Sequence, residues 1–257
     1  MTGLQTIADG MRRWRFWTFL AWQDIKQRYR GSVIGPFWTV GHLALTIAGI
    51  GFLYSGLMNI SQDGYFPFLA AGLLFWFLIS STVVDATNAF PQAGSILRQS
   101  SVPPIIFPLR IVVRNLIVFG HNMFVFVVVA VIFGTTPDPL PLLFTFPLLL
   151  VNLAWLSILV ALMSARYRDL GQLISQLMGF FLFVTPIFWV PSAVSGFRSA
   201  YVLYNPFAHF LEIVRAPLMG EAPAGISIAV CSALAVIGWA VAVFALIRHQ
   251  RKVVFWI

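Results

Sequence analysis

Charge is scarce in this sequence, and its scarcity excludes a water-soluble globular protein. Only 9% of the 257 residues are Asp, Glu, Lys or Arg, whereas 60% are hydrophobic. Soluble domains contain about 25% charged residues, and so few charges could not cover the surface of a body of this size. Lipid is the alternative solvent, and it requires apolar runs of roughly 18 residues or more. Such runs recur here without β-barrel alternation, which predicts an all-α membrane protein.

Lysine, cysteine and histidine are also rare, and this excludes several chemistries. The two lysines lie in DIKQRY (Lys26) and RKVVFW (Lys252), outside any G-x-x-x-x-G-K-[ST] phosphate loop, so an ordinary ATP site on this chain is excluded. Neither H-E-x-x-H nor G-x-S-x-G occurs, and we predict no catalytic residue and no enzymatic activity. The single cysteine, Cys231, permits no internal disulfide or thiolate cluster, and the four histidines lack ligand spacing, so no metal site is expected.

Six apolar segments predict six transmembrane helices. They cover about residues 35–58, 66–90, 105–133, 140–163, 170–190 and 226–247. At 1.5 Å per residue, each is long enough to cross a hydrocarbon core of about 30 Å.

Residues 4–30 predict an amphipathic helix ahead of the first span. The apolar stripe comprises Met11, Trp14, Ala21, Ile25 and Tyr29, and the basic stripe comprises Arg12, Arg15, Lys26 and Arg30. Tryptophans on the apolar side are typical of a helix that lies in the headgroup region. The alternative is a packed helix of a small cytoplasmic appendage; we favour the interfacial helix because no partner core is encoded nearby.

The basic residues predict the orientation. With six spans, fourteen of the sixteen Lys and Arg residues fall on one side, and only Arg198 and Arg215 fall on the other. Positive charge in short connections marks the cytoplasmic side, so both termini are predicted to be cytoplasmic. The net charge of +8 sits in these short connections rather than on one soluble face, so no nucleic-acid partner is expected.

Residues 191–225 predict a re-entrant or interfacial helical hairpin on the outer side. The segment is too apolar for a solvated loop, and four prolines interrupt it: Pro191, Pro206, Pro217 and Pro223. A seventh crossing is the alternative, but it would place the basic carboxyl end outside. Within the hairpin, Glu212 and Arg215 lie one helical turn apart and are expected to pair.

Four motifs in order resemble a known family. They are DIKQRYRGSVIGPFWTV (residues 24–40), ARYRDL (165–170), FFLFVTPIFW (180–189) and YNPFAHFLEIVRAPLMG (204–220). They resemble the type-2 ABC exporter permeases that move O-antigen, capsule and related lipid-linked polysaccharides. The resemblance covers nearly the whole chain, which would then form one transmembrane domain over residues 1–257.

This resemblance implies a division of labour between two proteins. The chain would be the permease, a homodimer in the bacterial inner membrane bound to two copies of a separate cytoplasmic ATPase. ATP and Mg would bind to that ATPase, with no cofactor on this chain. The substrate would be a lipid-linked glycan drawn from the membrane lipids of the cytoplasmic leaflet.

The resemblance also implies a coupling helix at residues 92–102, seated in a groove of the ATPase. The residues assigned to it are Ser95, Ile96, Leu97, Arg98 and Gln99. Pro91 and the Pro103–Pro104 pair bound this segment, which independently predicts a short isolated helix. The turn containing Arg166, Arg168 and Asp169 is a weaker second contact, and self-pairing within that turn is an equal alternative.

Substrate contacts are expected at two places in such a permease. Arg28 and Arg30 would attract the pyrophosphate of the lipid head group, although they also satisfy the positive-inside rule and would bind bulk anionic lipid. The conduit would lie between two protomers, lined by aromatic residues of the first and fifth spans and the hairpin. The candidates are Phe37, Trp38, Phe180, Phe181, Phe183, Trp189, Tyr201 and Tyr204, many of which would instead face lipid or pack between helices.

Three rival functions remain open at this point. A type-2 permease for a drug or small lipid would share the fold. A stand-alone secondary carrier or channel would depend on Asp85, an acid within the second span. A membrane enzyme acting on polyprenyl lipids is disfavoured because no pair of acids or histidines converges on one loop.

Overall fold

The computed structural model describes residues 3–58, 61–191, 200–250 and 252–257, and every regular element in these ranges is a helix. The helices are α1 (Gly3–Arg12), α2 (Trp14–Arg28), α3 (Phe37–Met58), α4 (Gln62–Ala86), α5 (Ala89–Gln92), α6 (Gly94–Gln99), α7 (Ile106–Ile132), α8 (Pro139–Arg166), α9 (Leu170–Val184), α10 (Ala200–Leu203), α11 (Pro206–Leu218), α12 (Gly225–His249) and α13 (Val253–Trp256). Five of them, α3, α4, α7, α8 and α12, are long and apolar enough to span a membrane. The fold is that of a multi-pass helical membrane protein.

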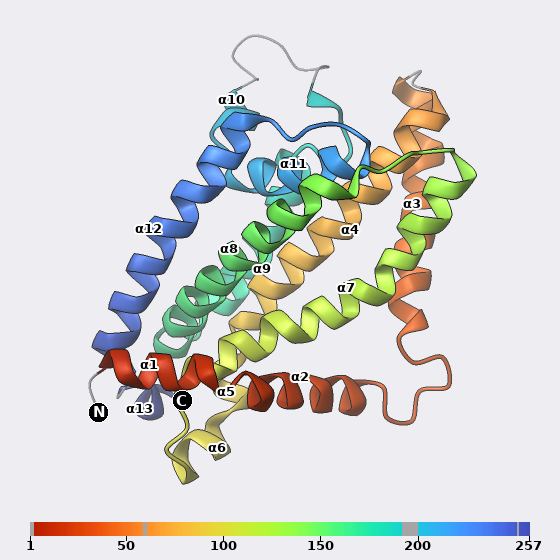
Figure 1. Cartoon of the computed structure of the whole chain (residues 1–257). Helices are drawn as coiled ribbons and strands as arrows, with labels where there is room; N and C mark the ends of the chain where they lie inside the picture. The colour runs from red at the N-terminus through yellow and green to blue at the C-terminus, as the bar shows by residue number, and fades with distance from the viewer. Residues whose placement is uncertain (1–2, 59–60, 192–199, 251) are drawn as a thin grey trace.

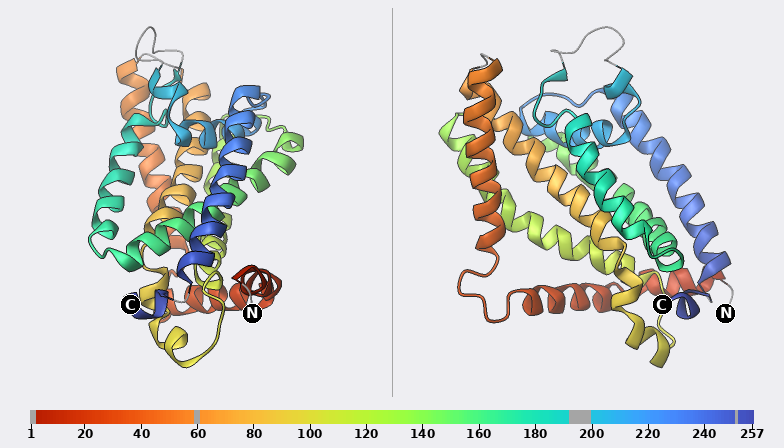
Figure 2. Two further views of the ribbon diagram at one scale, coloured as in Figure 1. Left: turned by 90° about the vertical axis from the view of Figure 1, so that its left-hand side faces the viewer. Right: turned by 180° about the vertical axis from the view of Figure 1, so that it is seen from behind.

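The bundle is built around α4. In its most apolar 18-residue window, 72% of α4 is buried, compared with 22% for α3 and 28% for α12. Helix α4 therefore forms the centre of the main hydrophobic cluster, while α3 and α12 stand at opposite edges with α7 and α8 between them (Figure 1). Seen from behind, α3, α4 and α9 lie across one face of the bundle (Figure 2).

Five of the six predicted spans are confirmed as long apolar helices, but the prediction for residues 170–190 is too long. Helix α9 ends at Val184 after 15 residues, which is about 22 Å. Pro186 disfavours helical backbone at the preceding residue, and Thr185 is extended with ψ 138°. The fifth apolar segment is thus a short helix followed by non-helical chain.

The non-helical chain after α9 is buried from Thr185 to Phe188, and side chains of other segments bond three of its polar groups. Tyr65 Oη donates to the Phe188 carbonyl at 2.7 Å, and Arg215 Nη1 donates to the Pro186 carbonyl at 2.6 Å. Asn205 Nδ2 donates to Thr185 Oγ1 at 3.0 Å. Non-helical backbone at membrane depth is tolerated where protein surrounds it and its polar groups find partners, and these three side chains meet that condition.

The amino-terminal segment forms two helices rather than the predicted single one. Helix α1 ends at Arg12 and α2 begins at Trp14, with Arg13 outside helical geometry (φ −80°, ψ 36°). Both lie across the lower end of the bundle, α2 beneath α7 (Figure 1). Ala21 and Ile25, assigned to the lipid-facing stripe, are buried in the protein instead. The expectation that no partner core exists for this segment is therefore wrong, because α7 is that partner.

The outer segment is helical but does not add a long span in its described part. Helix α11 has 13 residues, about 20 Å, and ten of them are buried where it packs on α4, α8 and α12. Asn205 caps it by accepting from the Phe207 backbone N–H at 3.0 Å, with Pro206 at the first helical position. Residues 192–199 of the predicted hairpin, including Arg198, lie outside the described residues.

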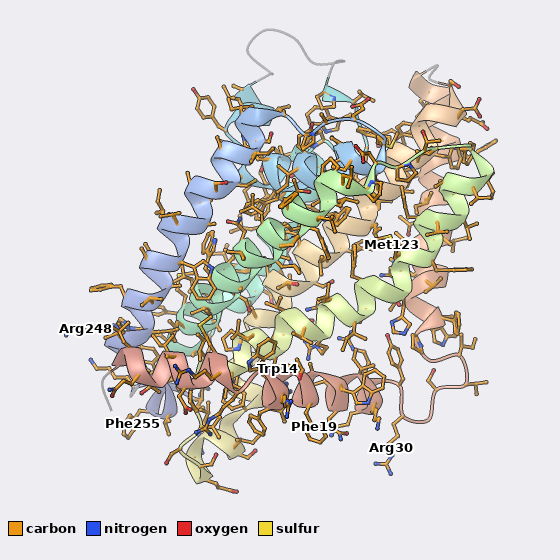
Figure 3. All side chains as sticks on the ribbon, in the orientation of Figure 1. Trp14, Phe19, Arg30, Met123, Arg248 and Phe255 are labelled. Atoms are coloured by element: carbon orange, nitrogen blue, oxygen red, sulfur yellow. The ribbon has the colours of Figure 1, made fainter. Side chains whose placement is uncertain are left out.

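Both ends of the chain lie at the lower end of the bundle (Figure 1). Arg30, after α2, and Arg248, in the last turn of α12, lie at this same end (Figure 3). Both arginines are among the basic residues that the sequence predicts for one side of the membrane.

Candidate functional site

Helix α6 is the element that projects furthest from the lower end of the bundle (Figure 1). It is shorter than the predicted segment 92–102, running from Gly94 to Gln99, and its side chains divide into two sets. Leu97 is buried and anchors the helix in a hydrophobic cluster, and Ile96 is half-buried. Ser95, Arg98 and Gln99 are exposed. The helix therefore presents a polar, partly cationic surface that is held to the bundle by Leu97.

A cleft joins α6 to the turn between α8 and α9. Its volume is about 660 Å³, and it is lined by Arg98 from α6, Arg168 and Asp169 from the turn, and Trp256 from α13. The Arg98 guanidinium donates to the backbone oxygen of Ile257, which ties α6 to the end of α13. The structure thus brings together the two segments that the sequence analysis assigned to ATPase contact.

The α8–α9 turn leaves its charged groups exposed. The Arg166 guanidinium lies over the rings of Tyr167 and Trp256, 5.2 and 5.8 Å from their centroids. Within the described part of the chain, neither Arg168 nor Asp169 takes part in an ion pair. Self-pairing in this turn, the alternative left open by the sequence, is therefore absent from the described structure.

Arg28 and Arg30 lie at the end of α2 and just beyond it, and both are exposed. Neither forms an ion pair with any residue that the structure describes. Arg30 extends away from the bundle at its lower end (Figure 3). Two unpaired guanidinium groups at the bundle edge can bind phosphate oxygens of a lipid or a free anion.

A buried ion-pair network that the sequence analysis missed connects α2, α4 and α7. Asp24 accepts two hydrogen bonds from Arg110, at 2.6 Å from Nε and 2.8 Å from Nη2. Arg114 Nη2 lies 2.7 Å from Asp85 Oδ2, to which Asn115 also donates at 3.0 Å. Two features of the sequence could have indicated it. Arg110 and Arg114 have i, i+4 spacing on one helix, and Asp24 is the only acid in the basic segment of α2. The positive-inside rule explains both arginines without any partner.

The aromatic conduit candidates fall into separate groups in one protomer. Phe37 and Trp38 begin α3 at the lower end and are each 65% exposed, while Phe180 and Phe183 lie late in α9 and are also exposed. Helices α3 and α9 flank α4 on the same face (Figure 2). One protomer therefore does not bring the two pairs together.

The remaining conduit candidates are less uniform. Phe181 packs edge-on against Phe207 with ring centroids 5.0 Å apart, and Trp189 is half-buried and donates from Nε1 to the Phe183 carbonyl at 3.0 Å. Tyr204 is exposed. The side chain of Tyr201 lies outside the described residues. Phe181 is thus a packing residue, while Tyr204 has a free ring face.

A second cavity, of about 780 Å³, lies between α4 and α11 and borders Arg215. The Arg215 guanidinium contacts the Pro186 carbonyl, lies 4.1 Å from the Phe68 ring centroid and pairs with Glu212 at 3.5 Å, as the sequence predicts. Burial lowers the pKa of Arg215 to about 10, and the Glu212 carboxylate offsets part of that shift. The guanidinium therefore stays protonated at neutral pH and acts as a buried structural cation.

Comparison with known proteins identifies the class that this architecture represents. The model of the ABC-2 type transporter family matches residues 15–219, most of the chain, and the protein belongs to that family. It is a membrane permease subunit, of a class that lacks an ATPase domain and pairs with an ABC ATPase.

Three relatives of the chain are permease proteins of O-antigen export systems. The chain is 26% identical over 202 residues to the O-antigen export system permease protein RfbA of Myxococcus xanthus, covering 77% of each chain. It is 25% and 23% identical to two proteins of that name from Klebsiella pneumoniae, covering 74% of each chain.

Proposed function

We propose that this protein is the permease of an ATP-driven exporter that moves a lipid-linked polysaccharide across the bacterial inner membrane. The chain forms a single type-2 ABC transmembrane domain, acts as a homodimer and binds two copies of a cytoplasmic ATPase that carries the ATP and Mg. The choice of substrate class rests on one observation. The chain is similar, over about three quarters of their length, to three proteins named as O-antigen export permeases.

The lower end of the bundle supports the assignment of the ATPase-binding face. Helix α6 and the α8–α9 turn share one cleft there, and their exposed Arg98, Arg168 and Asp169 offer charges to a partner surface. We assign this end to the cytoplasm, with both chain termini, because the basic residues gather there. Asp85, on which a stand-alone carrier would depend, is paired with Arg114, which argues against that rival.

This orientation requires a sixth crossing between the lower end of α8 and the upper end of α12. Helix α9 starts the crossing, and the largely buried chain from Thr185 to Val190 completes it; the Phe188 carbonyl accepts from Tyr65 and the Pro186 carbonyl from Arg215. In this proposal α10 and α11 form the outer hairpin, and α1 and α2 lie at the cytoplasmic interface.

The face formed by α3, α4 and α9 is the proposed dimer face and conduit. Phe37, Trp38, Phe180 and Phe183 are large exposed aromatics on its two outer helices. In a dimer formed through this face, the α9 aromatics of one protomer would face the α9 aromatics of its partner across the dimer axis. Flat ring faces suit the C–H surfaces of sugars, and exposed aromatics of this kind also suit a lipid tail.

Deletion of the gene in its native host is the direct test of the substrate class. We expect loss of a surface polysaccharide and accumulation of its lipid-linked precursor on the cytoplasmic side of the inner membrane, both restored by the wild-type chain. Normal surface glycans together with increased sensitivity to small amphiphiles would instead favour the rival drug or small-lipid permease.

The charge of Arg98 provides a test of the coupling face. Arg98→Glu is expected to reduce the amount of ATPase retained by the purified permease roughly tenfold, equivalent to about 1.4 kcal/mol, because it reverses a cation on the proposed contact surface. Retention is measured by quantitative immunoblotting after affinity purification.

The matched control is Arg12→Glu, an equal charge reversal at an exposed position of α1, at the same end of the bundle but outside the cleft. It should retain the ATPase at the wild-type level. Equal retention by Arg98→Glu and the wild type, at unchanged thermal stability, would remove Arg98 from the contact.

A further inference from the structure

The ion-pair network beneath α7 consists of four charged side chains from three helices. Asp24 of α2 and Asp85 of α4 supply two carboxylates, and Arg110 and Arg114 of α7 supply two guanidinium groups. Arg114 is shared, since its Nη2 lies 2.7 Å from Asp85 Oδ2 and its Nη1 lies 3.6 Å from Asp24 Oδ2. The four groups therefore form one continuous chain of contacts with no net charge.

Burial makes this network far more costly to break than a surface salt bridge. The two arginine side chains are 9% and 12% exposed, Asp24 is 14% exposed and Asp85 is 26% exposed. By comparison, the pair between Asp9 of α1 and Arg13, which lies between α1 and α2, is 32% and 49% exposed and is a weak surface salt bridge. Removing one member of the buried network would leave its partner charged and unpaired, which is strongly unfavourable.

The position of Asp85 connects the network to α6. Asp85 is the penultimate residue of α4, and the chain continues from there through α5 directly into α6. Displacement of α6 by a bound ATPase therefore acts on the end of α4 that holds Asp85. At the other end of the network, Asp24 belongs to α2, the helix that leads into Arg28 and Arg30.

We propose that Asp24, Arg110, Arg114 and Asp85 form an ion-pair relay that transmits movement of α6 to the interfacial helix α2. The proposal rests on the proposed function, because it takes α6 to be the helix that the ATPase moves. In this relay Arg114 is the junction, holding Asp85 closely and Asp24 loosely, while Arg110 fixes α2 to α7 through two parallel hydrogen bonds. The four residues are positioning residues that set where α2 presents its exposed cations.

Two cysteine reporters in the intact complex with the ATPase test the relay. In a Cys231→Ser background, Gln27→Cys reports on α2 and Ser101→Cys reports on the chain just after α6; both positions are exposed. The rate of labelling by a membrane-impermeant maleimide is measured in nanodiscs with and without ATP and vanadate. We expect a change of roughly threefold or more at both reporters in the parent protein.

Neutralising Asp24 should change the response of one reporter and leave that of the other unchanged. Asp24→Asn is expected to abolish the nucleotide-dependent change at Gln27→Cys and to preserve it at Ser101→Cys. The double charge exchange Asp24→Arg with Arg110→Asp should restore at least half of the change at α2, which a merely destabilised α2 would not do. The matched control Asp9→Asn removes the partly exposed Asp9–Arg13 pair and should behave as the parent protein.

The possible failures are distinguishable. An unchanged response at Gln27→Cys in the Asp24→Asn variant overturns the relay, as does a lost response that the charge exchange does not restore. Absence of any nucleotide response at Ser101→Cys in the parent complex contradicts the proposed function instead. If Asp24→Asn does not accumulate in the membrane, Asp24→Glu replaces it. This variant keeps the charge but displaces the carboxylate, and the responses at Gln27→Cys and Ser101→Cys are interpreted in the same way.

Discussion

Arg215→Met is expected to lower the free energy of unfolding by about 2–4 kcal/mol. The substitution leaves the buried Pro186 carbonyl without its donor, at about 1–3 kcal/mol, and removes the contact of a desolvated cation with the Phe68 ring. Since Pro186 lies in the non-helical chain after α9, the loss falls on a segment that has no helical hydrogen bonds of its own. The measurement is the thermal unfolding midpoint of the protein in lipid nanodiscs.

Glu212→Gln is the matched control for Arg215. It removes the charge of the neighbouring partner but keeps the Arg215–Pro186 hydrogen bond, and the pair it weakens is 3.5 Å apart with Glu212 one-third exposed. Its cost should be smaller than that of Arg215→Met, because the amide oxygen of Gln can still accept from the guanidinium and Glu212 is partly exposed. If Glu212→Gln lowered the midpoint as much as Arg215→Met, the stabilising role would belong to the ion pair and not to the carbonyl contact.

Gly238→Ala is the second change with a large expected effect. A Cβ added at Gly238 would lie 2.3 Å from the Trp155 ring, on the facing helix α8. The ring cannot easily move, because Trp155 Nε1 donates to Asn152 Oδ1 at 2.9 Å and Asn152 Nδ2 donates to the Cys231 carbonyl at 3.1 Å. Helix interfaces in membranes depend on small residues at such close approaches, and we expect a loss of about 1–3 kcal/mol.

Gly120→Ala provides the comparison for Gly238. Gly120 lies in the interior of α7, and a Cβ there meets no neighbour within 4 Å, so the substitution should be neutral or gain up to about 1 kcal/mol from helix propensity. Adding Trp155→Leu to Gly238→Ala should cost much less than Trp155→Leu alone, because the smaller side chain relieves the clash. Additive costs in this double variant would show that the two residues are not in close contact.

The long spans could be predicted from the sequence because lipid imposes one requirement on all of them. Each apolar run must be long enough to cover the hydrocarbon core. Five runs form helices of that length, with ends close to those expected. The helix predicted for the fifth run, residues 170–190, was too long because hydropathy does not take account of Pro186. The apolar character continues past this proline, although α9 ends before it. The stabilising partners of that segment, Tyr65 and Arg215, come from distant parts of the chain.

The ion-pair network shows why the site was harder to predict than the fold. Asp24, Asp85 and Arg114 belong to three helices, and nothing in local periodicity says that α2 lies beneath α7. The positive-inside rule explains arginines at the cytoplasmic ends of spans without any partner, so Arg110 and Arg114 seemed already accounted for. The exposed aromatics pose the opposite difficulty, because lipid, a second protomer and a glycan all favour the same side chains.

Affinity purification of this chain from its native membrane, with quantification of the proteins that accompany it, tests the central claim most directly. The account predicts a cytoplasmic protein with a phosphate-binding loop at one copy per permease chain, bound through the face that contains α6. An intact chain that is purified alone and still transports its substrate would contradict the account, and Asp85 would then be the first residue to substitute.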